Sequence, residues 1–327
     1  MRTFRHASGA FFVLIILLAS CGSKPQTKMY RIGLGPWVGF GPFYLAKEKG
    51  FFREAGVDVD LIVLTGVAER NSALKAGRID GLAAPVDYFV MSAGNNLETK
   101  VVMAIDESTG GDGIVAKKGI QKFEDLRGKR LAFQRGLPSE FFVRAMLRQH
   151  GLKVEDLNTV DMETSEAGAA FITNKVDAAA IWEPWLTMAR EEGGGHILAS
   201  TSDHPDLIVD CLAFNNEVMA SSREDVQKIV NALLKAIAYW KANAAEANQV
   251  MAPHFQVDAA KYGAILSGAK FCDLERNRSY FGAEGVRGPV YQVAERAAEI
   301  WKEAGVIGRA VKADSVVDPG FIHKAAR

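Results

Sequence analysis

Cysteine and histidine are scarce in this chain, with three and six residues among 327. The histidines are scattered and the cysteines lie far apart, so neither follows the short ligand spacing of a metal motif. Ser139 and Ser165 have no histidine that would complete a nucleophilic triad. The sequence therefore predicts no metal, no cofactor and no catalytic residues, which argues against an enzyme.

An excess of charge of one sign is also missing, because 39 lysine and arginine residues balance 39 aspartate and glutamate residues. Proteins that bind nucleic acids usually carry a basic patch or stripe, and none stands out here. The hydrophobic content of 48% and the charged content of 24% are ordinary for a globular protein. Nucleic acid is therefore not an expected partner.

The longest apolar run is too short to span a bilayer, which takes roughly 20 residues. This run, Ala10–Ala19, follows a basic start and overlaps the sequence Leu18-Ala19-Ser20-Cys21. The order of basic, apolar and small residues is typical of an export signal. The last four residues resemble a bacterial lipobox, whose cysteine is lipidated before cleavage. An uncleaved anchor, or a plain signal with a chance cysteine, is the alternative.

We therefore predict a lipoprotein signal peptide over residues 1–20, lipidation at Cys21 and a flexible tether over residues 21–28. The protein would be lipid-anchored to a membrane on its extracytoplasmic (periplasmic) side. That compartment permits disulfides, but the sequence favours two unpaired, partly buried thiols at Cys211 and Cys272.

Strand-like and helix-like patterns alternate from residue 29, pause at the glycine-rich stretch 110–113, and then resume as far as residue 214. This rhythm predicts an α/β fold with two units, each a mainly parallel sheet covered by helices on both faces. Beyond residue 216 only helical patterns are recognisable, and residues 314–321 have a loop-like composition. The strand-like stretches are 29–35, 57–64, 79–84, 100–105, 113–117, 129–134, 158–162, 178–182, 196–200 and 208–214.

The turn after the first expected strand is rich in glycine, with the pattern Gly33-x-Gly35-Pro36-Trp37-x-Gly39. It does not match the G-x-G-x-x-G spacing of a dinucleotide site, and the second strand ends in Leu64-Thr65 without the acidic residue that such a site requires. The glycines instead allow a ligand to approach the backbone closely. Trp37 would be exposed in this turn.

Ligands of open α/β sheets bind beyond the carboxyl ends of the strands. Those ends bring together aromatic, acidic and hydroxyl side chains, which we interpret as the lining of one cleft. The candidate ligand-binding residues are Trp37, Gly39, Phe40, Asp87, Asp106, Ser108, Asp112, Ser139, Glu183, Trp185 and Asp210.

Several segments resemble the nitrate/sulfonate/taurine class of ABC-importer substrate-binding proteins. They are RIGLGPWVGFGPFYLAKEKGFFREAGVDVDL, DESTGGDGIVAKKGI, FEDLRGKRLAF, AAFITNKVDAAAIWEPWLTMA and LIVDCLAFN, in that order along the chain. The resemblance runs from about residue 30 to about residue 320.

The resemblance implies the two-lobed type II periplasmic-binding-protein fold, with a helical C-terminal part. Residues 29–113 and 212–327 would form lobe one and residues 114–211 lobe two, joined by two hinge crossovers near 113–116 and 209–214. It also implies a monomer that captures a small solute and delivers it to an ABC permease and its ATPase.

The expected cleft holds several carboxylates and no obvious arginine or lysine at the strand ends. An anion about 4 Å from one carboxylate would lose roughly 4 kcal/mol at an effective dielectric of 20, whereas a helix N-terminus offers only about 0.3–1 kcal/mol. Tryptophan rings attract cations as well. We therefore expect a small cationic or zwitterionic solute that is guanidine-, amine- or taurine-like.

Three alternatives remain open. One is a small anion such as an alkanesulfonate or nitrate. A second is an enzyme resembling the thiamine-pyrimidine-precursor synthases, which the missing cysteine cluster disfavours. The third is a ligand sensor of the same fold.

Overall fold

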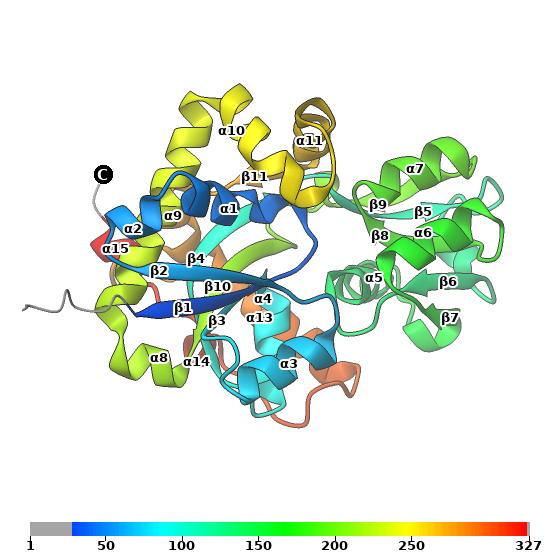
Figure 1. Cartoon of the computed structure of the whole chain (residues 1–327). Helices are drawn as coiled ribbons and strands as arrows, with labels where there is room; N and C mark the ends of the chain where they lie inside the picture. The colour runs from blue at the N-terminus through cyan, green and yellow to red at the C-terminus, as the bar shows by residue number, and fades with distance from the viewer. Residues whose placement is uncertain (1–27, 326–327) are drawn as a thin grey trace, which may run out of the picture.

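The computed structural model describes residues 28–325, which form two sheets covered by helices (Figure 1). The first sheet has the strand order β11-β4-β10-β3-β1-β2, and the second has the order β7-β6-β8-β5-β9. Each sheet is the centre of one lobe, so the predicted two-lobed α/β fold is confirmed. The predicted signal peptide, Cys21 and all of the tether except Lys28 lie outside the described residues.

The first sheet is mixed in direction, whereas the sequence predicts a mainly parallel sheet in each lobe. Strand β1 pairs in parallel with β2 and β3, whereas β10 runs antiparallel to both β3 and β4. The βα rhythm accounts for the parallel part, and the strand that returns from the second lobe adds the antiparallel pairs. The strands are β1 (Met29–Leu34), β2 (Asp58–Val63), β3 (Gly81–Pro85), β4 (Thr99–Ser108), β10 (Val209–Asn215) and β11 (Ala269–Phe271).

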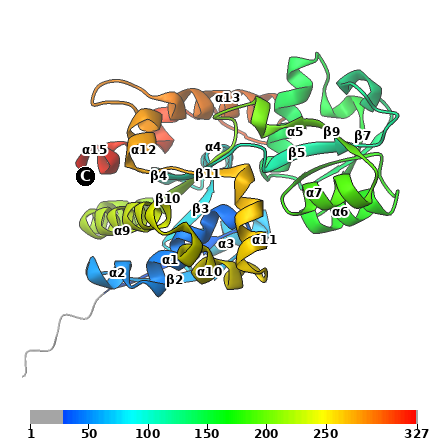
Figure 2. The same ribbon diagram turned by 90° about the horizontal axis from the view of Figure 1, so that it is seen from above.

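Helices cover both faces of this sheet. Helices α1, α2 and α9 lie against one face and α4 and α13 against the other, as Figure 2 shows. The helices are η1 (Val38–Phe40), α1 (Gly41–Glu48), α2 (Phe51–Glu54), α3 (Val67–Lys75), α4 (Val86–Gly94), α8 (Asn216–Ser221), α9 (Arg223–Ala242), α10 (Ala244–Met251), η5 (Ala252–Phe255), α11 (Ala259–Ile265), η6 (Leu266–Gly268), α12 (Leu274–Phe281), α13 (Pro289–Glu303), α14 (Ala313–Val316) and α15 (Gly320–Lys324).

The second lobe is smaller and is mixed in the same way, because β5 is antiparallel to β8 and β9 whereas β6 is parallel to β7 and β8. Its strands are β5 (Asp112–Ala116), β6 (Arg130–Phe133), β7 (Asn158–Asp161), β8 (Ala178–Trp182) and β9 (His196–Ser200). Its helices are η2 (Phe123–Leu126), α5 (Pro138–Gln149), η3 (Val154–Asp156), α6 (Thr164–Ile172), α7 (Trp185–Glu192) and η4 (Thr201–Asp203).

Two short passages connect the lobes, at residues 109–111 between β4 and β5 and at residues 201–208 between β9 and β10. Both lie a few residues before the expected crossovers, because residues 112–113 already pair in the second sheet and residues 209–211 pair in the first. The hydroxyls of Ser108 and Thr201, 2.8 Å apart, tie the two passages together.

An ion-pair network also holds the end of β4 and the second passage against α12. The guanidinium of Arg276 bonds Glu107, at the end of β4, and Asp206, in the second passage. The backbone N–H of Asp206 donates to the Glu107 carboxylate at 3.1 Å. The Glu107 side chain is therefore bound to α12 and is not part of the cleft lining.

The C-terminal part differs from expectation in two places. Strand β11 adds a three-residue edge to the first sheet, where the sequence suggested only helices. The stretch 314–321, expected to be loop, contains most of α14 and the start of α15. Both Cys211 and Cys272 are free and buried, which confirms two unpaired thiols. Between residues 28 and 325, no helix combines the length and the apolar character needed to cross a membrane.

Candidate functional site

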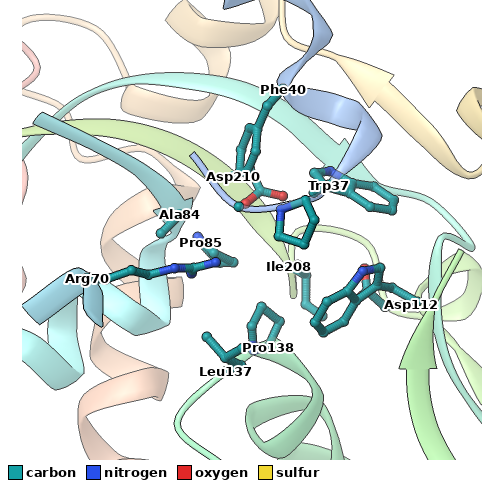
Figure 3. Close-up of a pocket in the computed structure, with 13 residues that line it drawn as sticks. Trp37, Phe40, Arg70, Ala84, Pro85, Asp112, Leu137, Pro138, Ile208 and Asp210 are labelled. Atoms are coloured by element: carbon teal, nitrogen blue, oxygen red, sulfur yellow. The ribbon is translucent and has the colours of Figure 1, made fainter. Parts of the chain in front are cut away.

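A small cavity lies between the two lobes, at the end of the sheets where the passages cross (Figure 3). Its volume is about 40 Å³, the space of roughly three water molecules, which suits a compact guest. It is lined by Gly35, Pro36, Trp37, Phe40, Arg70, Ala84, Pro85, Asp112, Leu137, Pro138, Trp182, Ile208 and Asp210.

Four of the predicted site residues line this cavity. Trp37 and Phe40 come from the turn after β1, Asp210 from the start of β10 and Asp112 from the start of β5. The last two begin antiparallel strands, so they lie beside the carboxyl ends of β3 and β8. The lining thus combines acidic and aromatic groups from both lobes.

Trp37 is held by a buried hydrogen bond. Its indole Nε1–H donates to Oδ1 of Asp106 at 2.9 Å, and the side chain is buried, so the expected exposure of Trp37 is wrong. Gly39 makes this bond possible, because a Cβ there would overlap both Nε1 of Trp37 and the Asp106 carboxylate. Neither Gly39 nor Asp106 lines the cavity; they position the ring that does.

Replacing Gly39 by alanine should therefore weaken solute binding through Trp37. The new Cβ would push the indole away from Asp106, leaving a buried carboxylate without its donor. We expect a loss of affinity of about tenfold or more, the range of a charge-assisted hydrogen bond. The affinity of each variant for the bound solute is measured by calorimetric titration. Gly119→Ala is the control, because nothing lies within 4 Å of a Cβ at that position. Equal affinities for the two variants would contradict this role.

Burial governs the acid–base behaviour of the aspartates around the cavity. It raises the pKa of Asp106 to about 7, against the lowering effect of the Trp37 hydrogen bond. It also raises the pKa of Asp112 to about 6. Asp210 has a pKa well above its usual range, because of burial first and the charges of its neighbours second. Asp106 and Asp112 therefore titrate near neutral pH, and a bound cation would favour the charged form of each of these carboxyl groups.

Asp87 lies behind the cavity, in the first turn of α4. Burial raises its pKa to about 7, and neither carboxylate oxygen has a hydrogen-bond partner within the part of the chain described. Its backbone carbonyl accepts the indole N–H of Trp301 at 3.1 Å. Asp87 does not line the cavity, but its charge contributes to the raised pKa of Asp210.

The other predicted residues have different places. The Ser108 hydroxyl forms a hydrogen bond with the Thr201 hydroxyl between the two passages. The Ser139 hydroxyl donates to the backbone carbonyl of Gln134. Glu183 accepts hydrogen bonds from the backbone N–H and the hydroxyl of Thr187. Glu183 and Trp185 line a second, outer groove that shares Pro36 and Trp182 with the inner cavity.

Arg70 is the lining residue that the sequence reasoning missed. It lies in the interior of α3, away from any strand end, and is 5% exposed. The signal that could have found it is its helix face, since Arg70 shares the buried side of α3 with Ala73 and Leu74. A cation at the i, i+3, i+4 spacing of an apolar stripe calls for a partner or a function.

The fold and the cavity define a two-lobed protein of the periplasmic-binding-protein class. Within that class the chain belongs to the NMT1/THI5-like family, whose model matches residues 37–247.

Its curated relatives include a binding protein of Brucella abortus, 29% identical over 248 residues, which cover 73% of this chain and 76% of the relative. An aliphatic sulfonates-binding protein of Bacillus subtilis is 24% identical over 325 residues, covering 95% and 94%. A Saccharomyces cerevisiae protein named as a 4-amino-5-hydroxymethyl-2-methylpyrimidine phosphate synthase is 26% identical over 213 residues, covering 61% and 62%.

Solved structures share the fold. The aliphatic sulphonate binding protein SsuA of Escherichia coli has a TM-score of 0.73 at 20% identity, covering 88% of this chain and 97% of that chain. The nitrate-binding protein NrtA of Synechocystis PCC 6803 has a TM-score of 0.71 at 14% identity, covering 91% and 88%. At these identities the likeness concerns the fold alone.

Proposed function

We propose that this chain is the substrate-binding protein of an ABC importer, and that it captures a small cationic or zwitterionic solute between two closing lobes. The observation that carries the proposal is the cavity, whose charged and aromatic lining comes from both lobes. A guest that contacts both lobes binds the closed form more tightly than the open one, and this difference drives closure. The sulfonate- and nitrate-binding proteins of the same fold support the transport role.

The charge of the lining supports a guest with a positive group. Asp112 and Asp210 face the cavity from opposite lobes, with Asp106 and Asp87 behind them. The rings of Trp37 and Trp182 add faces that attract cations. A guanidine-, amine- or taurine-like solute has the matching charge and size.

A small anion, such as an alkanesulfonate or nitrate, is the second candidate, because Arg70 lines the same cavity. The names of the sulfonate- and nitrate-binding relatives favour it as well. Against it stand the two lining carboxylates, which an anion would have to approach within the same small space.

The proposed protein works outside the cytoplasm as a lipid-anchored monomer, attached at Cys21 after removal of residues 1–20. It delivers its solute to a permease and its ATPase, and it performs no chemistry on the solute. We take the first lobe as residues 29–108 and 209–325, with the second lobe between the two passages.

Solute-induced stabilisation of the purified chain tests this function. We expect one member of a panel of guanidinium, ethylammonium, taurine, urea, ethanesulfonate and nitrate to raise the melting temperature saturably and to be recovered unchanged. Asp112→Asn should reduce the shift, whereas Asp314→Asn should not, because Asp314 is an exposed residue whose carboxylate pairs with Arg287. A solute that is converted during incubation, or a panel without any stabilising member, would refute the receptor function.

A further inference from the structure

Arg70 presents two unused donor groups to the cavity. Its Nε–H donates to the carbonyl of Leu64 at 3.1 Å, and its guanidinium lies 5.9 Å from the ring centre of Tyr88. Within residues 28–325, neither terminal nitrogen of Arg70 has a hydrogen bond or an ion pair. Arginine stays charged at any physiological pH, so a guanidinium this deeply buried requires a partner with an acceptor.

The lack of a side chain at Gly35 allows the guanidinium of Arg70 to reach the cavity. A Cβ at Gly35 would lie 2.6 Å from the terminal Nη2 of Arg70, so this glycine leaves the space that the guanidinium occupies. Figure 3 shows the side chain reaching from α3 toward the space that Asp210 and Asp112 also border. The position of Arg70 is thus built by its neighbours.

Asp210 is the counterpart on the other side of the cavity. No hydrogen bond to its carboxylate is found among the described residues, although the side chain is only 5% exposed. Arg70 and Asp210 are close enough for each charge to affect the pKa of the other. They nevertheless form no ion pair within 4.0 Å in the described chain. In the described chain, the cavity therefore separates a guanidinium with two unpaired nitrogens from a carboxyl group without a hydrogen bond.

A guest with a single charge can satisfy only one of these two groups. A bare cation near Asp210 meets the field of Arg70, and a bare anion near Arg70 meets the fields of Asp210 and Asp112. A guest with a carboxylate at one end and an ammonium at the other gains both attractions and removes both unpartnered charges. Fork-shaped pairing with a planar carboxylate is the geometry that arginine provides best.

We propose that this cavity selects a compact zwitterion, with Arg70 binding its anionic end and Asp210, supported by Asp112, binding its ammonium end. The inference rests on the proposed solute-binding function and narrows its substrate class. Arg70 is then a specificity-determining residue, which rejects simple amines and guanidinium as much as it recruits the zwitterion.

Three probes with the same short chain test the proposal by calorimetric titration. β-Alanine carries both charges, propionate lacks the ammonium and ethylammonium lacks the carboxylate. We expect the native protein to bind β-alanine at least about tenfold more tightly than either single-charge probe, the range of one charge-assisted hydrogen bond. Ethylammonium or propionate binding as tightly as β-alanine would overturn the proposal.

Two variants test which side chain binds each charged end of the zwitterion. Arg70→Gln should weaken β-alanine about tenfold or more and leave ethylammonium unchanged or tighter. Asp210→Asn should weaken β-alanine and ethylammonium but not propionate. Arg78→Gln is the control, because Arg78 is an exposed residue that follows α3, and within the described chain its side chain donates only to Ser72. Unchanged β-alanine affinity in Arg70→Gln would overturn the proposal.

Gly35→Ala provides an independent variant if Arg70→Gln does not fold, because its Cβ displaces the guanidinium without removing the charge. It should weaken β-alanine as Arg70→Gln does, and unchanged affinity would overturn the proposal. Binding of guanidinium or nitrate, without any binding of β-alanine or taurine, would refute the zwitterion and leave the receptor function intact. Stabilisation by no solute at all would refute the receptor function itself.

Discussion

The ligand-free protein should lose thermal stability as the pH rises from 5 to 8. The carboxyls of Asp87 and Asp106 have pKa values raised by burial to about 7, and that of Asp112 is raised to about 6, from 3.8. In this pH range the folded chain therefore holds protons that the unfolded chain has released. Stability falls with pH wherever the folded state binds more protons.

The expected size follows from the same values. One pKa unit corresponds to about 1.4 kcal/mol, so a group with a pKa of about 7 loses roughly 3 kcal/mol of stability between pH 5 and pH 8. For a chain of this size we expect a melting temperature lower by roughly 5 °C or more. Carboxyls with lowered pKa, such as those of Asp177 and Asp225, act in the opposite direction but only below about pH 4.

Calorimetric melting temperatures between pH 5 and pH 8, measured for variants with one carboxyl group replaced, test whether the buried carboxyl groups cause this dependence on pH. Asp106→Asn keeps an acceptor for Trp37 and removes a titrating group, so the dependence on pH should become flatter. Asp314→Asn, at an exposed position, should leave the dependence as it is. A melting temperature that rises between pH 5 and pH 8 would contradict the protonation of the buried carboxyls.

Removing the side chain of Asn277 should destabilise the first lobe strongly. Asn277 is fully buried in α12. Its Oδ1 accepts the backbone N–H of Ala104 at 2.8 Å, and its Nδ2 donates to the carbonyls of Ala104 and Cys272 at 2.9 and 2.8 Å. The amide thus continues the pairing of β4 where the short strand β11 stops.

Asn277→Ala would leave several buried backbone groups without partners, at about 1–3 kcal/mol each. We expect a loss of about 3–5 kcal/mol in the free energy of unfolding, measured by urea titration. Asn277→Asp is the more specific variant, because the aspartate side chain has the shape of asparagine but lacks the two N–H donors of the amide. Asn216→Ala, which removes one exposed hydrogen bond to Glu98, should cost less than 1 kcal/mol or so. Comparable losses at positions 277 and 216 would contradict the role of Asn277.

Trp37 follows the carboxyl end of β1, where the rule about strand ends looks for ligand-binding residues. Asp112 and Asp210 stand at the start of antiparallel strands, and they come under the same rule because they pair with the last residues of β8 and β3. Arg70 escapes this rule because it reaches the cavity from the middle of a helix. Gly39 and Asp106 are found by the rule but act behind Trp37, and only the packing of the turn against β4 reveals that.

The fold was predictable to a similar degree. The alternation of apolar strands and amphipathic helices predicts the two lobes, because each βα unit repeats the same pattern of buried and exposed residues. Strand β11 has only three residues, one of them the exposed Lys270, so it carries no recognisable period. Its pairing depends on β4, which is distant in the sequence.

The pairing of Arg276 with the end of β4 and with the second passage bears on how the proposed solute would enter. In the proposed closing of the lobes, the pairing of Glu107 and Asp206 with Arg276 would confine the movement to residues 109–111 and 201–205. Those few residues define a short rotation axis beside the Ser108–Thr201 hydroxyl pair. The cavity would then open on the side away from these residues, and the outer groove bordered by Glu183 and Trp185 would be the entrance.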